Sequence, residues 1–202
     1  MGKNLRTANK AAGKRLPKAS RREQLLKTAQ RIARERGTDA LTLGYLAERA
    51  GVSKPIAYEH FGSRAGLLIA LYKEIDDKQV AALQEALQRT RRKLEDVARV
   101  MSEAYMHCYA LLGAEWLAIS AALKGDEEME AFQRELIASY VGIYRDALAP
   151  YSSLSTARLR MLCVGIIGAA EALAREMTQG RIEESAAADA LATLIVKTIS
   201  GK

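Results

Sequence analysis

Residues 46–61 read LAERAGVSKPIAYEHF, and this stretch decides the fold. Two helices joined by a tight turn need a small residue where they approach, a glycine four positions later and an apolar residue directly after it. Ala47, Gly51 and Val52 meet these needs at the required spacing. The stretch therefore predicts a helix-turn-helix motif.

The second helix of this motif is predicted to have an inner and an outer side. Ala57 and Phe61 are four residues apart and should face inward. The residues left mostly outward or along the edges are Lys54, Ile56, Tyr58, Glu59 and His60. Such an exposed polar set is typical of a recognition surface. An ordinary pair of packed helices would show the same pattern, so the motif needs its context to be informative.

The chain before the motif predicts one amphipathic helix. Apolar positions form a single stripe over residues 25–33, Ser20 and Glu23 have the spacing of a capping box, and Gly37 supplies a left-handed stop. We therefore expect this helix to begin with Ser20 as its cap.

Further helix starts are marked by hydroxyl side chains. Thr42 is expected to cap the first helix of the motif, and Ser53 is expected to cap the second, whose first turn tolerates Pro55. After Gly62 a leucine-rich amphipathic pattern continues past Leu87 and predicts a long helix that joins two modules.

The chain of 202 residues reads as helical throughout. Ala, Leu, Glu, Arg and Lys dominate, apolar residues recur at helical spacing, and alternating β-branched runs are absent. These patterns predict an all-α fold. We expect a basic arm over residues 1–19, a helix-turn-helix domain over 20–64 and a larger helical domain over 65–202.

Charge is concentrated at the N-terminus. Residues 1–62 contain fourteen lysines and arginines against five acids, a formal charge of +9, whereas the remainder carries −2. Concentrated positive charge attracts phosphate polyanions or an anionic membrane surface. The basic arm is expected to follow a DNA minor groove, and the alternative is a disordered tail that only adds solubility.

The stretch from Arg22 to Ile75 closely resembles the DNA-binding domain of the TetR family of bacterial transcriptional regulators, without gaps. The resemblance implies a three-helix DNA-binding domain followed by a helical domain that binds an effector and dimerises. It also implies that the chain is a homodimeric, ligand-responsive repressor of a palindromic operator in double-stranded DNA.

Carried over position by position, the resemblance places seven residues at the DNA, namely Thr42, Ser53, Lys54, Pro55, Tyr58, His60 and Arg64. Tyr58 and His60 are expected to hold phosphates, and Arg64 stands where many members have a phosphate-contacting lysine. Gly44 and Tyr45 depart from the family, because many members have Arg, Lys or Asp at these positions. A base contact that some members make from this helix is therefore expected to be missing. The expected DNA-binding residues are Thr42, Tyr45, Ser53, Lys54, Pro55, Ile56, Tyr58, Glu59, His60 and Arg64.

Groove chemistry ranks the base readers among these residues. Lys54 can donate to guanine, and Ile56 can pack on a thymine methyl group, so both are favoured. Glu59 can accept from cytosine N4, or it can be solvated or paired with a neighbouring Arg or Lys. Because a single recognition helix reads few base pairs, we expect a dimer whose two helices lie about 34–36 Å apart.

The larger domain offers candidates for the dimer interface and for an effector. Two late helices, at about 156–179 and 185–199, carry apolar and small residues and are expected to pair across a twofold axis. An aromatic and methionine cluster suits a pocket for a small apolar or amphipathic effector, although core packing explains it equally well. The candidate effector contacts are Met101, Tyr105, Tyr109 and Trp116.

Several function classes find no support in the sequence. Motifs for nucleotide binding, hydrolases and zinc proteases are absent, and His107 beside Cys108 has no third ligand at suitable spacing. We therefore expect no enzyme, no cofactor and no metal. The chain lacks a bilayer-spanning run and a secretory signal, so a cytoplasmic location without membrane contact is expected.

Two alternatives to a ligand-responsive repressor remain. The chain could be an architectural or protein-partner-controlled DNA-binding protein without a small-molecule effector. It could also be a peripheral membrane protein, although residues 1–20 offer only Leu5 and Leu16 as large apolar anchors.

Overall fold

The computed structural model describes residues 16–90, 93–122 and 127–201, and for residues 111–122 it describes the helical backbone alone. This part of the chain is built of helices without strands, which confirms the predicted all-α class. The α-helices are α1 (Lys18–Arg36), α2 (Leu43–Ala50), α3 (Lys54–Phe61), α4 (Arg64–Arg89), α5 (Leu94–Ala122), α6 (Glu127–Leu148), α7 (Thr156–Thr178) and α8 (Glu184–Ser200). Two 3₁₀ turns, η1 (Thr38–Ala40) and η2 (Ala149–Tyr151), join α1 to α2 and follow α6.

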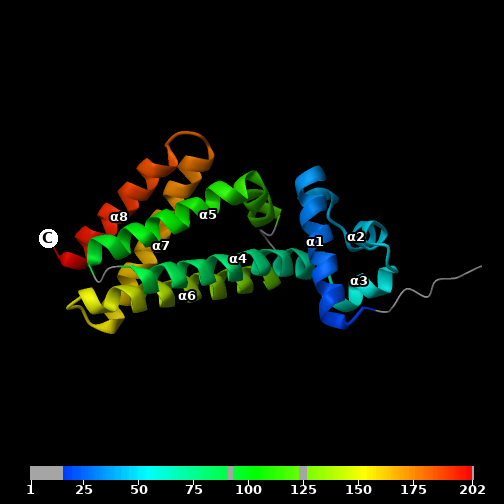
Figure 1. Ribbon diagram of the computed structural model, residues 1–202, viewed down its shortest axis with the longest axis horizontal. Helices are drawn as coiled ribbons and strands as arrows, with labels where there is room; N and C mark the ends of the chain where they lie inside the picture. The colour runs from blue at the N-terminus through cyan, green and yellow to red at the C-terminus, as the bar shows by residue number, and fades with distance from the viewer. Residues whose placement is uncertain (1–15, 91–92, 123–126, 202) are drawn as a thin grey trace, which may run out of the picture.

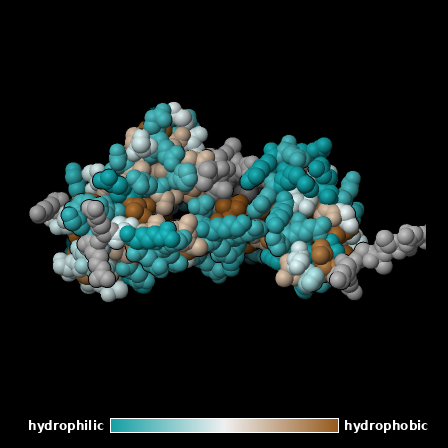
Figure 2. Space-filling model, in the orientation of Figure 1, coloured by the Kyte–Doolittle hydropathy of each residue, from teal (hydrophilic) through white to brown (hydrophobic). Residues whose placement is uncertain are grey.

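The helices form an elongated molecule with a small and a large unit (Figure 1). The short helices α1 to α3 gather at one end, and α4 runs from them into the larger unit formed with α5 to α8. Figure 2 shows that hydrophilic residues cover most of one face, with apolar residues gathered in small patches. Among the described residues, no helix combines the length and apolarity needed to cross a bilayer.

The core of the small unit extends into the first turns of α4. Leu25, Leu46 and Ala57 are fully buried in it and come from α1, α2 and α3. Residues 67–72 of α4 contribute four further buried apolar side chains and Tyr72 to the same cluster. The small unit is therefore packed onto α4 and does not end at the start of that helix.

The start of α1 differs from the expectation. The helix begins at Lys18, its N-cap residue is Pro17, and no side chain caps it. Pro17 has φ −54°, a value that suits the entry to a helix, and its carbonyl accepts the Arg21 N–H at 2.9 Å. Ser20 lies inside the first turn, so the predicted capping box is wrong. Gly37 ends the helix with φ +76°, but its ψ of 172° lies outside the left-handed helical region.

The start of α3 also differs in its hydrogen bonding. Ser53 occupies the N-cap position, but its side chain accepts no hydrogen bond from the helix. The reason is local: Pro55 at the second helical position has no N–H, and the Ile56 N–H bonds to the Ser53 carbonyl at 3.0 Å. The predicted side-chain cap is therefore wrong, and the exposed Ser53 hydroxyl remains available to an external partner.

The large unit has its own core, in which the late helices take part. The observed α7 and α8 match the two helices predicted from the sequence. Their inner sides carry buried side chains such as Cys163, Ile166 and Leu191, and α5 and α6 add Met101 and Tyr144. Cys163 is thus a core residue, and burial raises its pKa to about 11.

The end of α3 and the start of α4 come into very close contact. A Cβ atom at Gly66 would lie 2.1 Å from the carbonyl oxygen of Phe61, a separation that two such atoms cannot adopt. The Gly66 N–H donates to Ser63 Oγ at 2.9 Å, which caps α4. The junction between the two helices therefore requires glycine at this position.

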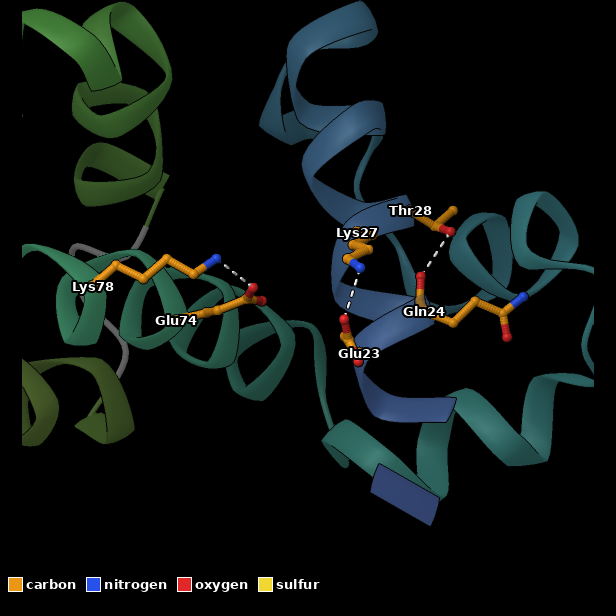
Figure 3. A network of polar contacts seen from close by, with 6 residues as sticks. All are labelled: Glu23, Gln24, Lys27, Thr28, Glu74 and Lys78. Carbon is orange, nitrogen blue, oxygen red and sulfur yellow. Dashed lines mark hydrogen bonds and ion pairs between the residues drawn. The ribbon is translucent and has the colours of Figure 1, made fainter. Parts of the chain in front are cut away.

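Ion pairs on α1 and α4 face each other where the small unit meets α4 (Figure 3). Lys27 Nζ lies 2.7 Å from Glu23 Oε1 on α1, and Lys78 Nζ lies 2.9 Å from Glu74 Oε1 on α4. The pKa of Glu23 is lowered first by its hydrogen bond to Lys27 and, more weakly, by Lys78 across the gap. The two ion pairs are therefore close enough to influence each other.

Candidate nucleic-acid interface

The turn between α2 and α3 has the geometry that the motif requires. Gly51 has φ +67° and ψ 34°, a left-handed conformation that costs glycine little. Its N–H donates to the Glu48 carbonyl at 3.1 Å, and the Val52 N–H donates to the Ala47 carbonyl at 2.9 Å. These bonds close the end of α2 and set the direction in which α3 leaves.

Thr42 caps α2 as predicted. Its Oγ1 accepts the Tyr45 N–H at 3.2 Å, and Thr42 itself is exposed beside the helix start. The helix places Leu43, Leu46 and Ala47 in the core. The first helix of the motif is thereby fixed against α1, with its cap residue at the surface.

The helix α3 turns one side to the core and the other to solvent. Ala57 and Phe61 are buried, as the sequence predicted. Tyr58 is 54% exposed, an unusual position for a large aromatic side chain. Lys54, Pro55 and Glu59 are exposed on the same helix. The outer side of α3 therefore offers a cation, an aromatic hydroxyl and a carboxylate to a partner.

Two of the predicted contact residues on α3 are half-buried. Ile56 packs against the core of the small unit, so part of its side chain is already covered. His60 lies at the end of α3, where burial lowers its pKa, and the nearby charges of Lys18 and Arg22 lower it further against the raising effect of Glu59. His60 is consequently neutral at pH 7 in the absence of a partner.

The start of α1 is bound to the end of α3. Arg22 donates from Nη1 to the His60 carbonyl at 2.9 Å, and its guanidinium carbon lies 5.0 Å from the centre of the Phe61 ring. Lys18 Nζ lies 3.4 Å from Glu59 Oε1. The acid on α3 is therefore paired with a neighbouring cation, which is one of the three possibilities given above for Glu59.

The position of Lys54 depends on its neighbour in α2. A Cβ atom at Gly44 would lie 3.6 Å from Lys54 Cε and 4.0 Å from Nζ. The lysine stem thus passes directly over Gly44, and a long side chain there would displace it. Tyr45 lies beside Gly44, accepts a hydrogen bond from Arg49 at 2.9 Å and has the Arg36 guanidinium 5.7 Å from its ring centre.

Arg64 is engaged inside the small unit. Its Nε donates to the Leu41 carbonyl at 3.1 Å, and its Nη2 donates to the Thr38 carbonyl at 2.9 Å. The same Nη2 lies 3.9 Å from Asp39 Oδ1. These contacts connect the start of α4 to the segment between α1 and α2. The expected contact between Arg64 and phosphate remains a prediction, and the guanidinium must serve both roles if it is made.

The helix-turn-helix segment is similar to that of a known protein family. The sequence profile described as "Bacterial regulatory proteins, tetR family" matches residues 25–71. This range covers the helix-turn-helix and the turns of α4 that share its core. Residues 25–71 of this chain are therefore similar to the TetR family of regulators. The resemblance noted in the sequence is confirmed.

Two relatives extend the match. The transcriptional activator FasR of Mycolicibacterium smegmatis is 41% identical over 78 residues, which are 39% of this chain and 36% of FasR. The regulator BetI of Rhizobium meliloti is 33% identical over 132 residues, 63% of this chain and 62% of BetI. The matches thus span less than two thirds of these relatives. Family and relatives are regulators of transcription rather than enzymes.

A solved structure supports the fold beyond the TetR-family domain. The transcriptional regulator FadR of Bacillus subtilis, in complex with stearoyl-CoA, has a TM-score of 0.67 at 16% identity. The similarity covers 89% of this chain and 98% of that one. The large unit therefore shares its helical arrangement with a regulator that holds a ligand.

The large unit contains a cavity of about 60 Å³ between α4, α5, α6 and α7. Of the predicted effector contacts, Tyr105 and Tyr109 line it. Met101 is fully buried in the core and is not among the lining residues, and the side chain of Trp116 lies outside the described residues. Residues 1–15 of the predicted basic arm also lie outside them.

Sequence reasoning missed lining residues on other helices. Tyr72 and Asp76 come from α4, and Tyr140 comes from α6. Tyr140 follows Asp76 by 64 residues, so no local sequence pattern indicates that these side chains meet. His107 lies elsewhere, with Nδ1 3.2 Å from Glu184 Oε1, and the described residues contain no group of three or more potential metal ligands.

Proposed function

We propose that this chain is a homodimeric transcriptional repressor that binds a partly palindromic DNA operator and releases it when a small molecule occupies the large unit. The observation that carries the proposal is the outer side of α3, which presents Lys54 and the 54% exposed Tyr58 from a TetR-family helix-turn-helix. A helix of this kind reads base edges in the major groove while neighbouring groups bind phosphate.

Dimerisation is supported by the outer side of α7. Met161 and Val164 are 67% and 48% exposed, although both are large and apolar. Gly165 and Gly168 follow at helical spacing, and a Cβ atom at either position would meet nothing within 4 Å. Such a stripe of exposed apolar and small residues favours close approach of a second helix.

The neighbouring helix α8 continues this surface. Leu194 is 41% exposed, and the small residues Ala190 and Ala186 are exposed one and two turns before it. Since α7 and α8 pack on each other, their outer sides form one face. We infer that a second copy of this chain covers that face, giving a four-helix interface.

Release by a ligand follows from the course of α4. The helix begins at the junction with α3 and carries residues of the cavity further along. A ligand that displaces α4 would therefore displace the recognition helices, and a fixed half-site spacing makes affinity sensitive to that movement. The cavity favours this scheme over an architectural protein without an effector.

Selection of bound duplexes from a random pool by the purified full chain tests the proposal. We expect an enriched inverted repeat with a steep dependence of affinity on salt. Transcription in vitro from a promoter carrying this repeat should fall when the protein is added. Absence of an enriched repeat would contradict operator binding, and increased transcription would contradict repression.

Two substitutions on α3 should separate phosphate contact from base reading. We expect Tyr58→Phe to weaken binding to all sequences alike, because it removes the tyrosine hydroxyl that is expected to contact the phosphate backbone. Lys54→Ala should cost about 1–3 kcal/mol on the selected operator and relax preference at one position. Titration against the operator and against random DNA checks both. Equal losses on the two DNAs for Lys54→Ala would refute its role in base reading.

His60 should make operator binding depend on pH. Its lowered pKa leaves it neutral in the free protein, whereas a nearby phosphate favours the imidazolium and raises the pKa in the complex. Binding then takes up a proton, so affinity should rise between pH 7.5 and pH 6, by at most about tenfold per unit of pKa difference. His60→Gln should flatten this dependence, and His107→Gln, the matched change at the other histidine, should retain it.

A further inference from the structure

The wall of the cavity in the large unit is aromatic and acidic. Four tyrosines and two carboxylates line it, and none of its described lining residues is a lysine or an arginine. These six residues are Tyr72, Asp76, Tyr105, Tyr109, Tyr140 and Glu171. The fixed charge of the wall is therefore negative. Exposed Ile137 and Glu171 lie on α6 and α7 and indicate that the cavity reaches the surface between these helices.

Asp76 is the acidic group held most firmly in place. The Tyr140 hydroxyl donates to its Oδ1 at 2.7 Å, across the space between α6 and α4. Asp76 is half-buried, and burial raises its pKa against the smaller lowering effects of the Tyr140 bond and of exposed Lys73. The Tyr140 hydroxyl bonds to Oδ1, so the second carboxylate oxygen, Oδ2, is able to accept a hydrogen bond from a ligand.

The tyrosines suit a positive ligand for a separate reason. The rings of Tyr105 and Tyr109 are stacked with their centres 5.2 Å apart and their planes at 23°. Burial raises the pKa of Tyr105 and of Tyr140, so both phenols stay neutral. Neutral aromatic rings attract cations through the negative charge on their faces, most strongly where water is excluded.

We propose that this cavity binds a small organic cation, of the alkylammonium class, with Asp76 as its counter-ion. The inference rests on the proposed function, since it names the effector to which the large unit responds. A cation would neutralise the carboxylate that burial disfavours, whereas an anion would meet two carboxylates without a basic partner on the described wall. The volume of about 60 Å³ restricts the ligand to few carbon atoms.

Calorimetric titration of the full chain without DNA tests the ligand class. The probes are tetramethylammonium, tetrabutylammonium, octanoyl-CoA as an anion and the neutral alcohol 2,2-dimethylpropan-1-ol, whose branched carbon skeleton matches the shape of tetramethylammonium. We expect tetramethylammonium to bind at least about tenfold more tightly than the neutral alcohol, the size of a desolvated cation–aromatic attraction. Tetrabutylammonium should bind more weakly because it exceeds the cavity.

Asp76→Asn tests the counter-ion while keeping the shape of the side chain. Asparagine can still accept the Tyr140 hydrogen bond, so we expect tetramethylammonium affinity to fall at least about tenfold with the fold intact. The melting temperature should rise by roughly 1–3 °C at pH 7, because an ionised Asp with a raised pKa costs stability above that pKa. Asp77→Asn changes the exposed neighbouring acid, whose charge adds a little to the raised pKa of Asp76, and should change both quantities far less than Asp76→Asn does.

Two results would overturn the proposal. One is equal tetramethylammonium binding by the wild-type chain and Asp76→Asn. The other is tighter binding of octanoyl-CoA or of the neutral alcohol than of the cation. Both leave operator selection untouched because no ligand is present in that experiment. Conversely, failure of selection with intact cation binding would refute the DNA function alone.

Discussion

Gly66→Ala is expected to destabilise the small unit and to impair DNA binding, although alanine normally stabilises a helix. The added methyl group would lie 2.1 Å from the Phe61 carbonyl oxygen, so the end of α3 must move away from α4. We expect a loss of about 2–3 kcal/mol and a fall in melting temperature of roughly 5–10 °C. Operator affinity should drop about tenfold or more, equivalent to the loss of one good base contact. Thermal unfolding and operator titration measure the two effects.

A matched control for this change exists in α6. Gly142 is also helical, and a Cβ atom there would meet nothing within 4 Å. Gly142→Ala should therefore raise stability by about 0.5–1 kcal/mol and leave operator binding unchanged. If Gly66→Ala also left stability and operator affinity undiminished, the close approach of α3 and α4 would not require glycine at residue 66.

Val164→Glu is expected to convert the dimer to a monomer. The side chain is 48% exposed on the outer side of α7, so the isolated subunit tolerates a carboxylate there. In the proposed interface, however, two symmetric carboxylates would be buried beside apolar and small residues. We expect dimerisation and operator affinity to weaken by about 100-fold or more. Sedimentation and operator titration at nanomolar protein check these outcomes.

The control for the dimer places the same charge elsewhere. Ala138 is exposed on α6, a helix that is not part of the proposed interface. Ala138→Glu should leave both the assembly and the operator affinity intact. A Val164→Glu chain that still sediments as a dimer would move the interface to another surface of the molecule.

The helix-turn-helix was predictable because its determinants are local. The turn requires a left-handed conformation at residue 51 and a small side chain at residue 47. Gly51 and Ala47 meet both requirements within five residues of sequence. The late helices were predictable for a similar reason, since burial on one side leaves a helical period. Local pattern failed at Ser53, where Pro55 removes the N–H that the side-chain cap would have used.

The cavity and the junction were beyond prediction because they depend on contacts between distant segments. Asp76 and Tyr140 bond at 2.7 Å from different helices, and apolar periodicity says nothing about which polar groups meet. Gly66 did leave a signal, a glycine in the first turns of a leucine-rich helix. Such a glycine indicates close approach of another backbone, but the sequence does not show which segment approaches.

The shared core at the start of α4 determines where this protein can be recombined with another. A chimaera joined at residue 64 would separate Arg64 from the Thr38 and Leu41 carbonyls and Gly66 from the Phe61 carbonyl. It would also divide the apolar cluster to which residues 67–72 contribute. The portable module therefore runs through Tyr72. Its exchange point with a foreign sensor lies inside a continuous helix, where the register of the graft decides the orientation of the two halves.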